Sequence, residues 1–293
     1  MDRWTANEGA AAPIAPRWVK PVMRAGYVGR GVVYALVGVL TLFAAWRGGE
    51  AEDAQSALSE VRDMPAGSVL IGAVALALLA YALYRAVNGW LDLDRYGSGA
   101  KGLFARGAMV VVALVHVGLA GVAAAVALHL TGGRGETGID RYTAMLLAWP
   151  FGRWLVAGIG LAVLGAGLYY FWKGWSEDYR EQIVESPLTR RLAPVLRFGL
   201  IAHGAVIALV GLFFLGAGWN YDASQAGGLG QAFDAIRGWT FGRVLLGIAA
   251  VGFVAFAVVC WVYAAYRIVP ARVSRTDRRR LLSGEPAGKV VGG

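Results

Sequence analysis

The tetrapeptide PFGR at residues 150–153 opens a long apolar stretch and decides the fold. Related tetrapeptides open two other apolar stretches, PAGS at 65–68 and TFGR at 240–243. The apolar stretch before each of them opens on a cation or histidine followed by glycine, at Arg30, Arg106 and His203. Recurrence at this period indicates one two-span unit in three copies, so the architecture follows from the unit.

The composition predicts that these copies cross a membrane. Hydrophobic residues make up 57% of the 293 residues and charged residues only 16%, whereas charged residues make up about 25% of a soluble domain. A helix needs about 20 apolar residues to cross a bilayer. Stretches of that length without Asp or Glu are 26–46, 67–89, 107–130, 152–173, 198–219 and 243–267. We therefore expect an all-α integral membrane protein with six transmembrane helices.

Copies with two spans each insert with the same polarity. We therefore expect three parallel two-helix repeats around a pseudo-threefold axis along the membrane normal. That axis is either a pore or filled by side chains, and the pattern leaves both open. Glycines within the spans are expected at close helix contacts. They pair as Gly204 with Gly211, Gly118 with Gly121, Gly158 with Gly165, and Gly247 with Gly252.

The outer loops also repeat. Apolar residues three and four apart precede each span-opening tetrapeptide, which predicts a short amphipathic helix on the outer surface. The predicted faces are Ala57, Leu58 and Val61; Tyr142, Thr143 and Leu146; and Ala232, Phe233 and Ile236.

Lysine and arginine are distributed unevenly between the two sides of the predicted spans. The side with both termini carries 21 of these residues and the other side carries 7. Cytoplasmic loops carry the excess of positive charge, so both termini are expected in the cytoplasm. The net charge of +9 then reflects this bias and contact with anionic lipid headgroups, not nucleic acid binding. The cluster Arg278, Arg279 and Arg280 is expected at the lipid surface.

These features divide the chain into six segments. A disordered or surface-lying cytoplasmic lead covers 1–22, and a basic cytoplasmic tail covers 269–293. The repeats cover 23–96, 97–176 and 195–268, with a cytoplasmic connector at 177–194.

The opening GYVGRGVVY at 26–34 resembles that of the bacterial membrane family called domain of unknown function 1206. The runs WPFGRWL at 149–155 and WTFGR at 239–243 fit the same pattern. The resemblance covers about residues 23–268 and implies an integral membrane protein of three two-span repeats. We expect it in the bacterial plasma (inner) membrane. It implies no catalytic or ligand residues. The third copy departs from the pattern at His203, and the first at Ala66 and Ser68.

Two groups of residues are candidate sites. Arg30, Arg106 and His203 share one repeat position near the inner surface, and one hypothesis is that they form a cationic ring that binds phosphate headgroups or filters anions. The favoured interpretation is that each cation snorkels and stabilises the end of its span.

The second candidate is an intramembrane polar site. His116 lies in the middle of a span, where an ionisable group suggests function. Tyr34, Tyr84 and Tyr169 are further polar residues within spans. The alternative for His116 is an imidazole hydrogen-bonded to a backbone carbonyl or a tyrosine. We expect no cofactor and no metal, because the histidines differ in depth and Cys260 is the sole cysteine.

Function is predicted less sharply than fold. The first hypothesis is a non-enzymatic structural, interaction or lipid-organising membrane protein, with no protein partner or oligomeric state predicted. The alternative is a passive channel or transporter for a small solute or anion along the pseudo-threefold axis, and a membrane enzyme acting on lipid comes third. Spans without carboxylates argue against ion-coupled transport. A chain without clustered nucleophile and base argues against an enzyme.

Overall fold

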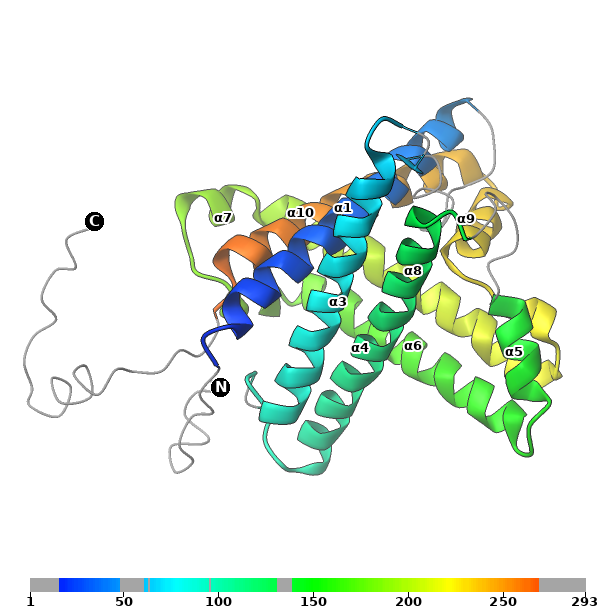
Figure 1. Ribbon diagram of the computed structural model, residues 1–293. Helices are drawn as coiled ribbons and strands as arrows, with labels where there is room; N and C mark the ends of the chain where they lie inside the picture. Colours follow the sequence, from blue (N-terminus) through cyan, green and yellow to red (C-terminus); the bar gives the residue numbers. More distant parts are fainter. Residues whose placement is uncertain (1–15, 48–60, 63, 95, 131–138, 269–293) are drawn as a thin grey trace, which may run out of the picture.

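The computed structural model describes residues 16–47, 61–62, 64–94, 96–130 and 139–268 (Figure 1). Long helices dominate it, and six of them are long and apolar enough to cross a membrane. They are α1 (Val19–Arg47), α3 (Gly67–Leu91), α4 (Ala100–Ala127), α6 (Gly152–Trp175), α8 (Ala193–Asn220) and α10 (Gly242–Tyr266). The prediction of an all-helical fold with six helices that could span a membrane is thereby confirmed.

The first helix of each copy begins earlier than its predicted span. Val19 begins α1, seven residues before the expected position, and Ala100 begins α4, also seven residues early. The 29 residues of α1 extend about 43 Å, well beyond a hydrocarbon core of about 30 Å. The helices begin earlier because polar residues before each apolar stretch are also helical, and the apolar length does not count them. Part of the predicted lead is therefore helix, and Val19 is fully buried.

Short elements lie between the long helices. The helices α5 (Ile139–Leu147) and α9 (Leu229–Arg237) occupy the predicted outer positions of the second and third copies. The connector contains η1 (Asp178–Gln182) and α7 (Pro187–Arg191), and η2 (Ala223–Gln225) precedes α9.

The predicted apolar faces of α5 and α9 differ in their outcome. The face of α9 is buried at all three of its predicted positions, which include Phe233. In α5, Thr143 is buried but Tyr142 is 68% exposed, so Tyr142 was placed on the wrong face. Leu147 is buried instead. In the first copy Val61 is buried, while Ala57 and Leu58 lie outside the described residues.

The same tight corner precedes α3, α6 and α10. The residue before each glycine has a left-handed backbone, with φ of 60°, 65° and 62° at Ala66, Phe151 and Phe241. The glycine N–H donates to the carbonyl three residues earlier, at 2.9, 2.8 and 2.8 Å. A Cβ on any of the glycines would overlap a carbonyl oxygen of the preceding segment. The glycines are Gly67, Gly152 and Gly242, and the carbonyls belong to Val61, Leu146 and Arg237.

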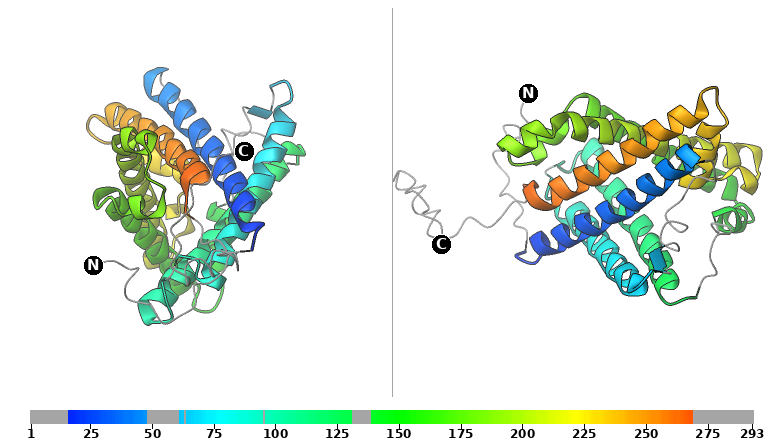
Figure 2. Two further views of the ribbon diagram at one scale, coloured as in Figure 1. Left: turned by 90° about the vertical axis from the view of Figure 1, so that its left-hand side faces the viewer. Right: turned by 90° about the horizontal axis from the view of Figure 1, so that it is seen from above.

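The long helices pack most extensively in pairs that join one copy to the next. These pairs are α3 with α4, α6 with α8, and α10 with α1, and Figure 2 shows α1 and α10 side by side. Within the copies, α1 packs on α3 and α8 on α10, whereas α4 and α6 have little contact among the residues described. The second copy is therefore held by its neighbours more than by its own two spans.

Glycine sets the closest of these contacts. A Cβ on Gly204 or Gly211 would overlap the backbone of α6, as predicted, and one on Gly167 would overlap the backbone of α8. The prediction fails for Gly118, Gly121, Gly158, Gly165 and Gly247, where an added Cβ would meet nothing within 4 Å. These glycines lie on the outer sides of their helices.

Candidate functional site

Arg30 is the most deeply placed cation in α1. Its side chain is 5% exposed, and it lies eleven residues after Val19, which is about 16 Å along the helix. Its Nη1 donates to the Tyr81 hydroxyl at 2.8 Å and its Nη2 to the Tyr34 hydroxyl at 3.4 Å. The guanidinium carbon lies 4.9 Å from the Tyr81 ring centre and 5.1 Å from that of Phe256. Arg30 is thus enclosed by aromatic side chains from α1, α3 and α10.

His203 shares these neighbours. It is 1% exposed, and its ring stacks on Phe256 at 3.8 Å between centres. It also meets Tyr34 and Tyr170 edge to face, at 5.0 and 5.2 Å. Its Nδ1 is buried and has no hydrogen-bond partner among the described residues. We call this group the Arg30 cluster; its members are Arg30, Tyr34, Tyr81, Tyr170, His203 and Phe256.

Arg106 occupies the same repeat position but has a different environment. Its Nε donates to the Gly89 carbonyl at 2.7 Å and its Nη2 to the Trp90 carbonyl at 2.9 Å. The last carbonyls of a helix lack intrahelical partners, so Arg106 caps the end of α3. It lies six residues after Ala100, about 9 Å along its helix. Two members of the predicted ring, Arg30 and His203, come together, and Arg106 lies apart from them.

Of the predicted polar site, His116 and Tyr34 both lie at the Arg30 cluster, whereas Tyr84 and Tyr169 lie outside it. His116 is 5% exposed, with Nδ1 2.8 Å from the Val112 carbonyl oxygen and its ring 4.5 Å from that of Tyr81. This is the arrangement expected from the alternative interpretation of His116. Tyr34 belongs to the Arg30 cluster, Tyr84 contacts Arg267, and Tyr169 is 44% exposed.

Arg85 is a residue that the sequence reasoning missed. It lies one helical turn after Tyr81 on α3, so both side chains share a face. Its Nε is buried without an acceptor, and in the described part of the chain it has no hydrogen bond or ion pair. The phenols of Tyr81 and Tyr170 lie within electrostatic reach of its charge. The available signal was a cation inside an apolar run that has no carboxylate.

A second buried arginine lies where α10 ends. Arg267 donates from Nη2 to both carboxylate oxygens of Asp94 at 3.0 Å. Its Nε donates to the Tyr84 hydroxyl at 2.8 Å, and its Nη1 to Oε1 of Gln182 at 3.0 Å. All of its nitrogens therefore have acceptors. Three segments far apart in sequence meet at this arginine.

The same network includes two further residues. Nζ of the buried Lys173 donates to Oε1 of Gln182 at 2.7 Å, and Nδ2 of Asn88 donates to Oδ2 of Asp94 at 2.9 Å. Backbone bonds flank it, from Val184 N–H to the Tyr266 carbonyl and from Ile268 N–H to the Gln182 carbonyl. We call this group the Arg267 network; its members are Tyr84, Asn88, Asp94, Lys173, Gln182 and Arg267.

Electrostatics keeps the ion pair of this network charged. Burial would raise the pKa of the Asp94 carboxyl, but the charge of Arg267 and the hydrogen bond from Asn88 outweigh burial and lower it below its ordinary value. Burial would likewise lower the pKa of Arg267, and the Asp94 charge raises it well above its ordinary value. Asp94 and Arg267 therefore stabilise each other's charged form.

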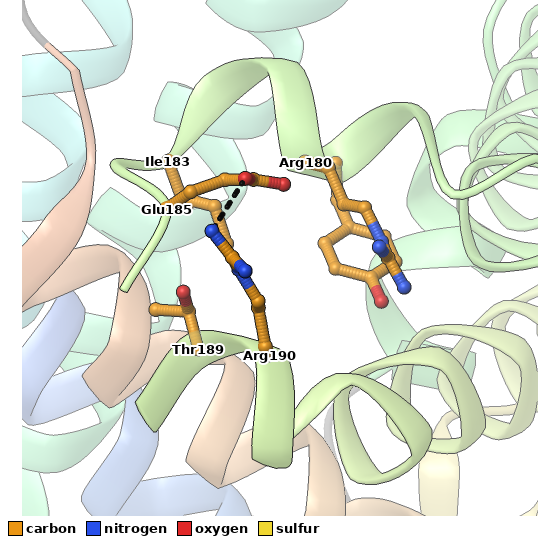
Figure 3. Close-up of a pocket in the computed structure, with 6 residues that line it drawn as sticks. Arg180, Ile183, Glu185, Thr189 and Arg190 are labelled. Atoms are coloured by element: carbon orange, nitrogen blue, oxygen red, sulfur yellow. Dashed lines mark ion pairs between the residues drawn. The ribbon is translucent and has the colours of Figure 1, made fainter. Parts of the chain in front are cut away.

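Little space for a ligand exists in the connector. A hollow there has about 10 Å³ of space, roughly what one water molecule needs. Figure 3 shows Glu185 and Arg190 paired across it, 3.6 Å apart. Its lining is Tyr179, Arg180, Ile183, Glu185, Thr189 and Arg190. Among the described residues, no three His, Cys, Asp or Glu side chains are grouped to hold a metal ion.

Comparisons with known proteins agree with this architecture. The chain is 26% identical over 245 residues to "Uncharacterized protein YxxB" of Bacillus subtilis (strain 168), across 82% of this chain and 88% of that protein. No solved structure matches it. A family model, Domain of Unknown Function (DUF1206), matches residues 25–92, 102–177 and 198–267, one match for each two-span copy. With its three internal repeats, the chain therefore belongs to the DUF1206 family.

Proposed function

We propose that the protein is a non-enzymatic, multi-pass protein of the bacterial plasma membrane that organises lipid or neighbouring membrane proteins. The packed interior carries this proposal. Where α1, α3, α8 and α10 meet, large side chains are buried to 2% exposure or less. They include Tyr81, Leu200, Leu246, Phe253 and Phe256. Side chains that fill the interior favour a closed bundle over an open channel.

We further propose that the three copies surround a pseudo-threefold axis and that both termini are cytoplasmic. The cyclic order of the close helix pairs, α3 with α4, α6 with α8 and α10 with α1, supports the axis. The repeated corners before α3, α6 and α10 support it as well. The uneven distribution of Lys and Arg supports the orientation. The basic tail, which lies outside the described residues, would then contact anionic headgroups.

Accessibility of single cysteines tests the closed bundle. In a Cys260→Ser background, one cysteine at a time replaces Tyr34, His116 or Ile207, and a membrane-impermeant reagent is applied from either side. We expect none of the three to react. Cysteine at Ser224 should react from outside only, and cysteine at Glu181 from the cytoplasm only, because both residues are exposed in loops. Labelling at Tyr34 or His116 would mean a water-filled path and would contradict the proposal.

A second candidate function is passive transport of a small anion. It is favoured by the buried guanidinium of Arg30, whose hydrogen-bond acceptors among the described residues are phenols. Flux of chloride and phosphate into liposomes distinguishes the two candidates. The closed-bundle proposal predicts no flux above that of protein-free liposomes. Flux that disappears in Arg30→Gln but persists in Arg106→Gln would establish the transport function instead.

A further inference from the structure

Buried positive charge exceeds the negative charge available to it. Arg30 and Arg85 lie inside candidate spans that contain no Asp or Glu. The nearby carboxylate of Asp94 is already bound by Arg267. Arginine does not deprotonate in proteins, and a buried charge without a partner is unfavourable. Among the described residues, neither Arg30 nor Arg85 has a carboxylate partner, and the Nε of each is buried without an acceptor.

The two guanidinium groups converge on the same phenols. Tyr81 accepts a hydrogen bond from Arg30 and lies one turn before Arg85 on α3. Tyr170, on α6, has its ring centre 5.9 Å from the Arg30 guanidinium carbon and interacts electrostatically with both arginines. The Nε atoms of Arg30 and Arg85 are buried without acceptors. The two unpartnered Nε atoms and the two phenols thus come from α1, α3 and α6 and lie within electrostatic reach of one another.

We propose that Arg30 and Arg85, with the hydroxyls of Tyr81 and Tyr170, bind one phosphate group. This site rests on the lipid-organising function proposed above and gives it a ligand, the phosphate of an anionic phospholipid of the inner leaflet. Guanidinium forks match the oxygens of phosphate in geometry and charge. Phenol hydroxyls add donors from other directions. A tetrahedral oxyanion with several acceptor oxygens uses these donors better than a single-atom anion does.

The position of Arg85 favours a lipid as the source of the phosphate. Arg85 lies six residues before Leu91, where α3 ends, which is about 9 Å along the helix. With a hydrocarbon core of about 30 Å, that depth is within reach of an arginine side chain from the headgroup layer. Part of Arg85 also remains exposed. On that side, α4 and α6 make little contact among the described residues.

Lipid binding to the full-length protein tests the site. Native mass spectrometry in detergent measures binding of phosphatidylglycerol to the wild type, Arg85→Gln and Arg106→Gln. Arg106 is the matched control, because it shares the repeat position of Arg30 and caps α3 through backbone carbonyls. We expect Arg85→Gln to weaken binding about tenfold, the effect of losing a charge-assisted hydrogen bond. Arg106→Gln should remain within twofold of the wild type.

Two further measurements keep the test decisive. Tyr170→Phe removes one hydroxyl with little risk to folding, and we expect it to weaken binding about threefold. Inorganic phosphate that displaces the lipid from the wild type would show that the site accepts phosphate from either source. Failure to displace it, with the Arg85 effect intact, would identify the lipid as the ligand.

Equal binding by Arg85→Gln and Arg106→Gln, with both folded by circular dichroism, would overturn the site. This result is independent of cysteine labelling. If cysteines in the interior react with the reagent while Arg85→Gln loses lipid binding, the closed bundle is refuted and the phosphate site is supported.

Discussion

Arg30 and Arg267 are both buried arginines, yet only Arg267 has its charge matched. Arg267 donates to a carboxylate, an amide oxygen and a phenol. Arg30 donates to two phenols, one of them at 3.4 Å, and its Nε has no acceptor among the described residues. A buried ion pair with all its hydrogen bonds made stabilises the fold, whereas a buried cation with an unpaired donor is a candidate ligand-binding site. The comparison separates a structural arginine from a binding one.

The largest effect should follow from breaking the matched arginine. Asp94→Asn removes the carboxylate and leaves Arg267 buried with an unmatched charge, like Arg30. Removing one partner of a buried pair costs about 3 to 5 kcal/mol, and the side chains here are 3% and 16% exposed. Chemical unfolding in detergent measures the loss. Glu181→Gln, which changes an exposed carboxylate in the connector, should change the free energy of unfolding by less than about 0.5 kcal/mol.

A result for Asp94→Asn as small as that for Glu181→Gln would contradict the comparison. Arg30 and Arg267 would then differ in their hydrogen-bond partners but not in their contribution to the free energy of unfolding.

The dependence of stability on pH sharpens the same contrast. The pKa of Asp94 is lower in the folded protein than its ordinary value of 3.8. A depressed carboxyl pKa contributes stability that is present above the unfolded value and is lost as the pH falls through the folded value. The stability difference between wild type and Asp94→Asn should therefore be constant from pH 5 to 8 and narrow below about pH 4. If this difference in unfolding free energy were unchanged at pH 3, the protonation of Asp94 would not be coupled to unfolding.

Local features of the molecule could be predicted from its sequence. Apolar length and the repeated tetrapeptides report on single segments, so six spans and three copies were predictable. The corner at Gly152 could be predicted from the repeated tetrapeptide. The left-handed backbone of Phe151 could not. The predicted pairing of Gly158 with Gly165 failed, because the choice between those positions and Gly160 and Gly167 depends on where α8 lies.

The site was predicted less well because it depends on contacts between distant segments. Asp94 and Arg267 are separated by 173 residues, and no local pattern connects them. Arg30 was recognised by its place at the start of an apolar run, which does not reveal the aromatic side chains of α3 and α10 that enclose it. Arg85 was counted among the cations that set orientation, which hid its burial. The shared repeat position predicted the same role for Arg106 as for Arg30. Arg106, however, lies only six residues after the start of α4, whereas Arg30 lies eleven residues after the start of α1.

A matched pair of tyrosines gives the next largest effect. Tyr81 accepts from Arg30 and Tyr84 accepts from Arg267, each at 2.8 Å. Tyr84→Phe leaves Arg267 with its carboxylate and should cost about 1 kcal/mol, whereas Tyr81→Phe removes the better of two acceptors and should cost about 2 kcal/mol. Unfolding in detergent with and without phosphatidylglycerol measures both. Added lipid should increase the cost of Tyr81→Phe alone, because this variant lacks one hydroxyl of the proposed site and gains less stability from bound lipid. Equal costs unaffected by lipid would refute the distinction.

Arg106 should show the smallest effect, and its size decides how far the repeat position governs function. Arg106→Gln removes two hydrogen bonds to the last carbonyls of α3, but Arg106 is only partly buried and water or headgroups can replace it. We expect a loss of about 0.5 to 1 kcal/mol in unfolding free energy, with phosphatidylglycerol binding unchanged. A loss as large as that of Asp94→Asn would place Arg106 among the buried charges. The cation at this repeat position would then contribute to the free energy of unfolding in each copy. The contrast between matched and unmatched arginines would apply to all three copies.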